Sequence, residues 1–262
     1  MSGTVTPGTG ARLTQVLLTC GVLYAALYVI LNDVVAASLY DGYDPLSQAI
    51  SELSATAAPT RVLLTATLPV FTVLMIAFGI GVWMSAEGNR ALRAAGGTLV
   101  AHGATFPLWL FAPMTSREQM GATMPVNDIG HIVLTVTAIL LILSQIGFAA
   151  AAFGKRFRIY SLLTAATVVG FGALTGTQAP NVARGGTTQW MGLYERISFA
   201  AWLLWVAVLA ITLFLHGGAR RDQGSRQRDG KRQRRRFAAA RYSVGVCPAL
   251  FTNAREKLAG FW

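Results

Sequence analysis

Apolar runs of about 20 residues recur along this chain of 262 residues, and this feature constrains its fold most. Each run can cross about 30 Å of hydrocarbon at about 1.5 Å per residue. Six stretches qualify, over residues 13–31, 61–84, 94–112, 130–152, 159–176 and 195–215. Because hydrocarbon offers no water to unpaired backbone groups, each stretch must be helical. The sequence therefore predicts an all-α, polytopic membrane protein with six transmembrane helices.

The composition agrees with a membrane protein and argues against a soluble one. Hydrophobic residues make up 53% of the chain and charged residues only 13%, whereas soluble domains carry about 25% charged residues. We expect a short N-terminus over residues 1–12, a six-helix transmembrane domain over 13–215 and a tail over 216–262. The two cysteines, Cys20 and Cys247, lie at opposite ends of the chain, so a disulfide framework is not expected.

Most of the net charge of +11 lies in the C-terminal tail, where residues 226–236 form a basic run without a core-forming pattern. Such a run is typical of disorder. Because it follows a membrane span directly, contact with anionic membrane lipids is the more economical interpretation, and nucleic acid is not expected as a partner. A solvated tail that only reinforces the charge bias is the other interpretation.

Basic residues also predict the orientation of the spans. Arg12 precedes the first stretch, Arg90 and Arg93 lie between the second and third, and residues 155–158 separate the fourth from the fifth. These positions and the tail fall on one side of a six-span protein, which the positive-inside rule makes cytoplasmic. We therefore expect a multi-pass protein of the cell membrane with both termini in the cytoplasm.

The first outer loop contains the segment YDPLSQAISELSA, residues 43–55. Its Asp44-Pro45 pair is typical of a helix start, with a side-chain cap before a proline at the first helical position. Apolar side chains follow at i, i+4 and i+7 on one face, namely Leu46, Ile50 and Leu53. The pattern predicts a short amphipathic helix, which either closes over the bundle as a lid or rests on lipid headgroups.

This segment resembles the hallmark of a family of membrane proteins, the domain-of-unknown-function family numbered 998. The resemblance extends to His131 at the start of the fourth stretch and to Gly-Leu-Tyr-Glu-Arg at 192–196, and it covers roughly residues 13–215. It implies a six-span bacterial or archaeal membrane protein, and it implies no particular activity. The basic tail lies outside it.

Small residues spaced four apart occur as Ala77 and Gly81 in the second stretch and as Gly172 and Gly176 in the fifth. Such pairs let helices approach closely, either within one bundle or between two copies of a chain. The oligomeric state is therefore left open.

Polar side chains mark the start of the fourth stretch. Asn127 or Asp128 is expected to cap this helix and to leave His131 in its first turn, where the helix dipole favours a neutral imidazole. His131 is the candidate catalytic residue, and an interfacial histidine is the alternative. His102, inside the third stretch, is expected to bond a neighbouring hydroxyl or carbonyl group.

The last stretch opens with Glu195 and Arg196, and we expect Arg196 to meet Asp44 or Glu52 of the first loop. Pro69 and Pro107 loosen helices on the same outer side, so a cavity, if present, should open outward. No cofactor or metal is expected, although His131, Asp128 and Glu195 are possible zinc ligands by type. The candidate ligand-binding residues are Asp44, Ser47, Glu52, Asp128, His131, Glu195 and Arg196.

Three functions are compatible with these features. The first is binding of a membrane lipid or small ligand in an outward-facing pocket. The second is a membrane-embedded, hydrolase-like enzyme in which His131 acts with Asp128 or Glu195. The third is a transporter, against which the scarcity of charges inside the spans and the lack of a visible repeat both count.

Overall fold

The computed structural model describes residues 9–121 and 123–216, which form helices joined by connections of different lengths. The tail over 217–262 and its lipid contact lie outside the described residues. The long helices are α1 (Thr9–Val29), α3 (Arg61–Met84), α4 (Arg90–Thr105), α5 (Val126–Ala152), α6 (Lys155–Val182) and a last helix, Met191–His216. A π-helix, Ile30–Ala36, joins α1 to the short α2 (Ala37–Leu39). Three 3₁₀ helices lie at Ile50–Ser54, Phe106–Leu110 and Arg117–Gln119.

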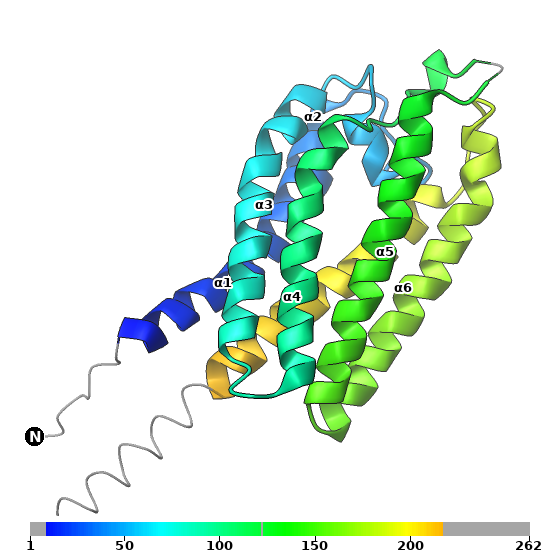
Figure 1. The fold of residues 1–262 in the computed structure, drawn as a ribbon. Coiled ribbons are helices and arrows are strands. Elements are labelled where there is room, and N and C mark those ends of the chain that lie inside the picture. Colours follow the sequence, from blue (N-terminus) through cyan, green and yellow to red (C-terminus); the bar gives the residue numbers. More distant parts are fainter. Residues whose placement is uncertain (1–8, 122, 217–262) are drawn as a thin grey trace, which may run out of the picture. The chain divides into compact units, whose positions relative to one another are not determined.

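The helices pack as a bundle, in which the last helix crosses behind α3, α4 and α5 in the view of Figure 1. In chain order α3 packs against α1, α4 against α3, α5 against α4 and α6 against α5. Trp202 and Trp205 of the last helix are among the largest fully buried side chains. Trp202 lies against Tyr24 of α1 and His102 of α4, and Trp205 donates a hydrogen bond to Ser161 of α6. The last helix therefore ties together helices that are distant in sequence.

The two ends of the bundle differ in construction. One end, here called the loop end, carries the three long connections 40–60, 106–125 and 183–190. The other, the turn end, has only the short connections 85–89 and 153–154. All the candidate ligand-binding residues belong to the loop end. That end also holds basic side chains, including Arg117, so the assignment of the turn end to the cytoplasm stays a prediction.

Five helices in the described part of the chain are long and apolar enough to cross a membrane: Gly10–Leu39, Arg61–Met84, Val126–Ala152, Lys155–Val182 and Met191–His216. The expected third span, 94–112, is not among them, and the count of six spans is not confirmed. The expected span 94–112 is divided in the structure. Most of it belongs to α4, which ends at Thr105, and the 3₁₀ helix Phe106–Leu110, which contains Pro107, follows directly. α4 packs between α3 and α5, and many of its small or polar residues are buried in the bundle.

Glycines let α3 and α4 touch backbone to backbone. A Cβ at Gly96 would lie 2.7 Å from the Trp83 nitrogen and 2.8 Å from the Gly79 carbonyl oxygen, so neither glycine can be enlarged without a shift. Gly81 makes a similar approach to Leu17 of α1, which agrees with the close packing expected for it. At the other pair, a Cβ on Gly176 would meet open space, whereas one on Gly172 would lie 4.0 Å from Ser198 Oγ of the last helix. Among the described residues, the helix approach at Gly172 is therefore looser than that at Gly81, and none is found at Gly176.

The first loop is not the amphipathic helix that its sequence predicts. A turn follows Asp44, and a helix of the 3₁₀ type forms only over Ile50–Ser54. Ile50 and Leu53 are buried as expected, but Leu46 is half-exposed and Glu52, expected on the polar side, is buried. The reason is that the carbonyl groups of this segment bond donors from elsewhere in the chain, as described next.

Candidate functional site

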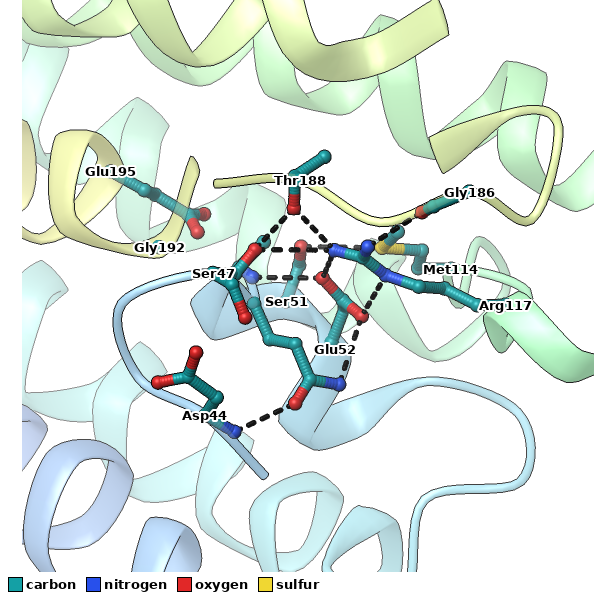
Figure 2. A network of polar contacts seen from close by, with 12 residues as sticks. Asp44, Ser47, Ser51, Glu52, Met114, Arg117, Gly186, Thr188, Gly192 and Glu195 are labelled. Carbon is teal, nitrogen blue, oxygen red and sulfur yellow. Dashed lines mark hydrogen bonds and ion pairs between the residues drawn. The ribbon is translucent and has the colours of Figure 1, made fainter. Parts of the chain in front are cut away.

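A buried ion pair between Glu52 and Arg117 forms the centre of the loop end (Figure 2). Arg117 Nε lies 2.7 Å from Glu52 Oε2, and Arg117 Nη2 lies 2.7 Å from Glu52 Oε1. The two side chains are only 13% and 6% exposed. Such a bidentate contact fixes both the distance and the angle between the two side chains. It can therefore hold the 3₁₀ helix Ile50–Ser54 of the first loop firmly against the second loop, residues 106–125.

Arg117 also connects the first and second loops to the third. Its guanidinium donates to the Gly186 carbonyl at 2.8 Å, to Thr188 Oγ1 at 2.9 Å and to the Ser47 carbonyl at 3.3 Å. Thr188 in turn donates to the Ser47 carbonyl. One side chain therefore gathers all three long connections, and nothing in the sequence analysis singled it out.

Arg196 fastens the first loop to the last helix, but not through the expected carboxylates. Its ion-pair partner is Asp33 of the π-helix, with Nε 2.9 Å from Oδ1, and it pairs with neither Asp44 nor Glu52. The expectation was wrong because Glu52 faces Arg117, and because the backbone of the segment turns its carbonyl groups toward Arg196.

Backbone carbonyls are what Arg196 recognises in the first loop. Nη1 lies 2.7 Å from the Pro45 carbonyl and 3.2 Å from that of Gln48, and Nη2 donates to Tyr43 Oη at 2.7 Å. The Tyr43 hydroxyl donates onward to the Ala49 carbonyl. Burial raises the pKa of Tyr43 above its usual value, so this hydroxyl keeps its proton.

The start of the last helix supplies further contacts to the same segment. Glu195 Oε2 accepts the Ile50 backbone N–H at 2.5 Å, and the Leu193 N–H donates to the Leu46 carbonyl at 3.0 Å. A Cβ on Gly192 would overlap the carbonyl oxygens of Pro45 and Gln48. We call the segment 43–52 with its partners the first-loop clasp, and the Gly-Leu-Tyr-Glu-Arg motif at 192–196 provides one wall of it.

Asp44 and Ser47 shape the turn from within. Asp44 Oδ1 accepts the Leu46 N–H at 3.0 Å. Hydrogen bonds from the Ser47 hydroxyl and the Leu46 backbone lower the pKa of the exposed Asp44 carboxyl. These roles are structural, and they leave no indication of a ligand at either residue.

Asp128 lies in the first turn of α5, but it does not cap that helix, and neither does Asn127. α5 begins after Pro125, without a side-chain cap. Asp128 Oδ1 instead accepts the Thr115 backbone N–H at 2.7 Å, and Asn127 donates to the Pro113 carbonyl at 2.8 Å. Asp128 Oδ2 is buried, and no described residue donates to it. Buried carboxylate oxygens are normally paired, so this one is an exception.

His131 lies one turn further along α5. Its Nδ1 is 3.1 Å from the Ala112 carbonyl, and the Trp109 ring meets the imidazole edge-on. A carbonyl can only accept, so Nδ1 carries the proton and Nε2 of the neutral imidazole is the acceptor. A carboxylate that orients a catalytic histidine would occupy Nδ1. Because Ala112 occupies that position, neither Asp128 nor Glu195 forms the expected dyad with His131.

His102 forms a separate buried network in the bundle. Gln145 of α5 lies with Nε2 3.1 Å from His102 Nδ1, and Trp202 Nε1 donates to Gln145 Oε1 at 3.3 Å. The partner is thus an amide, and not the hydroxyl or carbonyl group that was expected, because the hydroxyls of Thr98 and Thr105 bond carbonyls of their own helix. These contacts join α4, α5 and the last helix. His102 therefore has a structural role, since it helps to hold the three helices together.

The candidate residues thus fall into two sets. Asp44, Ser47, Glu52, Glu195 and Arg196 belong to the first-loop clasp, whereas Asp128 and His131 hold the second loop at the start of α5. None of the hydrogen bonds and ion pairs given above joins a residue of one set to a residue of the other. In the part of the chain that the structure describes, no three His, Cys, Asp or Glu side chains converge as metal ligands would.

Most of the chain, the clasp included, matches a family of known proteins. The family model described as "Protein of unknown function (DUF998)" matches residues 17–212. The chain belongs to the DUF998 family. The resemblance noted in the sequence is therefore confirmed, and its two best-marked segments, 43–55 and 192–196, are the parts that bind each other. No curated protein and no solved structure matches this DUF998 chain.

Proposed function

We propose that this DUF998 protein binds a membrane lipid or a small polar ligand at its loop end, at the start of α5. The observation that carries the proposal is the buried Asp128 Oδ2, which receives no hydrogen bond from the described residues. An unpaired buried acceptor costs about 1–3 kcal/mol, and more when it is charged. A donor from a ligand would recover that free energy.

His131 supports the same location. Nδ1 is held by Ala112, which fixes the ring, and Nε2 is an acceptor one helical turn from Asp128. Asn127 and Asp128 also hold the second loop in place, so the site is preorganised. Preorganised acceptors favour binding because little conformational entropy is lost when the ligand arrives.

In this proposal α4 is also a span, packed between α3 and α5, which raises the count to six, and the loop end faces outward from the cell. α4 and the 3₁₀ helix after it contain 16 and 5 residues. At about 1.5 and 2.0 Å per residue they reach the thickness of the hydrocarbon core. A helix that packs against neighbours on two sides needs less apolar surface than one with most of its surface in lipid, which explains the polar composition of α4.

Mass spectrometry of the purified full-length chain in detergent tests the proposal. The wild type is compared with Asp128→Asn, which keeps an oxygen for the Thr115 N–H but turns the second oxygen into a donor. His131→Asn is the second variant, because its amide can still donate to the Ala112 carbonyl while Nε2 is lost. The exposed Glu118→Gln is the matched control.

We expect a co-purifying lipid or small molecule in the wild type and in the control, and its loss in both test variants. The same bound species in all four proteins, or none in any of them, would refute the proposal. Equal thermal unfolding of the wild type and Asp128→Asn would show that any loss is not caused by misfolding.

A further inference from the structure

The half of α5 nearest the loop end is unusually open. None of residues 129–141 is buried, whereas the half nearest the turn end contains Ile142, Gln145, Ile146 and Ala149, all buried. α6 has the same asymmetry, because residues 169–181 are not buried and Ser161, Thr164 and Val168 are. The open halves of both helices lie within candidate membrane spans. Their side chains therefore face lipid rather than water.

Asp128 stands at the head of one strip of this open half. Residues at i, i+4, i+7 and i+11 share a helix face, and from Asp128 these are Ile132, Thr135 and Ile139. Ile132 and Thr135 are exposed and Ile139 is partly exposed. A hydrocarbon chain that lies along this strip therefore places its headgroup near Asp128. The Oδ2 atom of Asp128 receives no hydrogen bond from the described residues.

The position of Asp128 also indicates the kind of donor. The positive end of the α5 dipole already compensates part of the carboxylate charge, which weakens the attraction of this carboxylate for a cation. A neutral hydroxyl group supplies a donor that does not depend on that attraction, and a hydrogen bond to a charged acceptor is stronger than one between neutral groups. A hydroxyl-bearing headgroup is thus favoured over an ammonium group.

We infer that the ligand is a lipid with a hydroxyl-bearing headgroup, such as a glycerol or sugar headgroup, which donates to Asp128 Oδ2 while an acyl chain lies along Ile132, Thr135 and Ile139. This inference rests on the proposed function and names its ligand class. It commits to a lipid in the membrane, as opposed to a free polyol from the medium, because the strip below Asp128 lies in a candidate membrane span.

The test uses two lipids of equal charge and equal acyl chains, dioleoylphosphatidylglycerol and dioleoylphosphatidylmethanol. Only the first has headgroup hydroxyls, and any attraction to the basic tail is the same for both. Each is titrated into the delipidated full-length chain, and binding is followed by native mass spectrometry. Free glycerol is titrated as the water-soluble source of the same hydroxyl groups.

We expect the wild type to bind phosphatidylglycerol about tenfold or more tightly than phosphatidylmethanol, as loss of one hydrogen bond to a charged group predicts. Asp128→Asn should abolish that preference. Thr135→Trp should weaken both lipids about tenfold by obstructing the strip, whereas Val136→Trp should not. Thr135 and Val136 are adjacent and both exposed, so the second variant is a matched control for the first.

Any one of four results would overturn the inference. Two concern the headgroup: an equal affinity for the two lipids, or a preference that survives in Asp128→Asn. The other two concern the acyl chain: equal effects of the two tryptophan variants, or binding of free glycerol as tight as that of the lipid. If the wild type still retains a ligand that Asp128→Asn loses, the proposed function stands and only the ligand class is wrong.

Discussion

Removal of either member of the ion pair between Glu52 and Arg117 should strongly destabilise the loop end. Removing one member of a buried pair leaves an uncompensated charge and costs about 3–5 kcal/mol. We expect the destabilisation by Glu52→Gln to lie near the lower limit of this range. Glutamine still offers an oxygen to the Ala49 N–H, which Glu52 Oε1 accepts at 2.8 Å. Arg117→Met should lie near the upper limit, because it also loses the contacts to Gly186 and Thr188.

The double variant should cost less than the two single variants together, because it leaves neither charge unpaired. We expect a coupling free energy of about 2–3 kcal/mol from the double-mutant cycle. The assay is thermal unfolding in detergent, where a loss of about 3 kcal/mol lowers Tm by about 6–12 °C for a domain of this size. The exposed Glu118→Gln beside the pair should change stability by no more than about 0.5 kcal/mol.

Additive effects in that cycle would refute the reasoning, since independent residues have no coupling free energy. A cycle on Asp33 and Arg196 provides the comparison. Those side chains are 28% and 17% exposed, so solvent screens them more, and their coupling should be smaller. A larger coupling for that pair would show that burial does not set the strength of these contacts.

Three further predictions concern the clasp and the topology. Gly192→Ala should destabilise the protein by about 1–3 kcal/mol and expose residues 40–60 to protease, because the added Cβ overlaps the Pro45 and Gln48 carbonyls; unchanged proteolysis would contradict the close contact. The pKa of Asp44 is lower in the folded protein than in the unfolded chain. The stability that the ionised carboxylate contributes is therefore complete above the ordinary pKa of about 3.9, and it is lost as the pH falls through the lower pKa of the folded protein. Proteolysis of the first loop should therefore increase only in acid, and Asp44→Asn should remove that dependence. In a background without the native cysteines, a cysteine at 118 should label from outside intact cells and one at 156 only after permeabilisation, and the reverse pattern would overturn the orientation.

Hydrophobic runs predicted the helices well, because apolar length is a property that each segment carries alone. The 94–112 segment was harder, since α4 packs in the bundle through Gly96 and Gly103 and buries His102. A helix that touches other helices does not need the composition of one that touches lipid. Its status as a span therefore cannot be read from hydrophobicity.

The contacts of the first loop could be predicted only in part. The sequence marked Arg196 as its anchor, but the groups that Arg196 binds include the carbonyls of Pro45 and Gln48. Every residue has a carbonyl, so no side-chain pattern reveals which ones are used. Arg117 was missed as well, although it is the only basic residue of the connection 106–125, and this was the signal that could have indicated it.

The clasp joins parts of the chain that are synthesised far apart in time. Ile50 and Glu195 are 145 residues apart, and Asp33 and Arg196 are 163 residues apart. At about 5–20 residues per second, the ribosome needs about 7–30 s to make the intervening chain. During that interval the first loop has emerged without the helix start that binds it. The first loop therefore acquires its final structure only after the last span has entered the membrane, and a nascent chain arrested before residue 190 should display that loop unprotected.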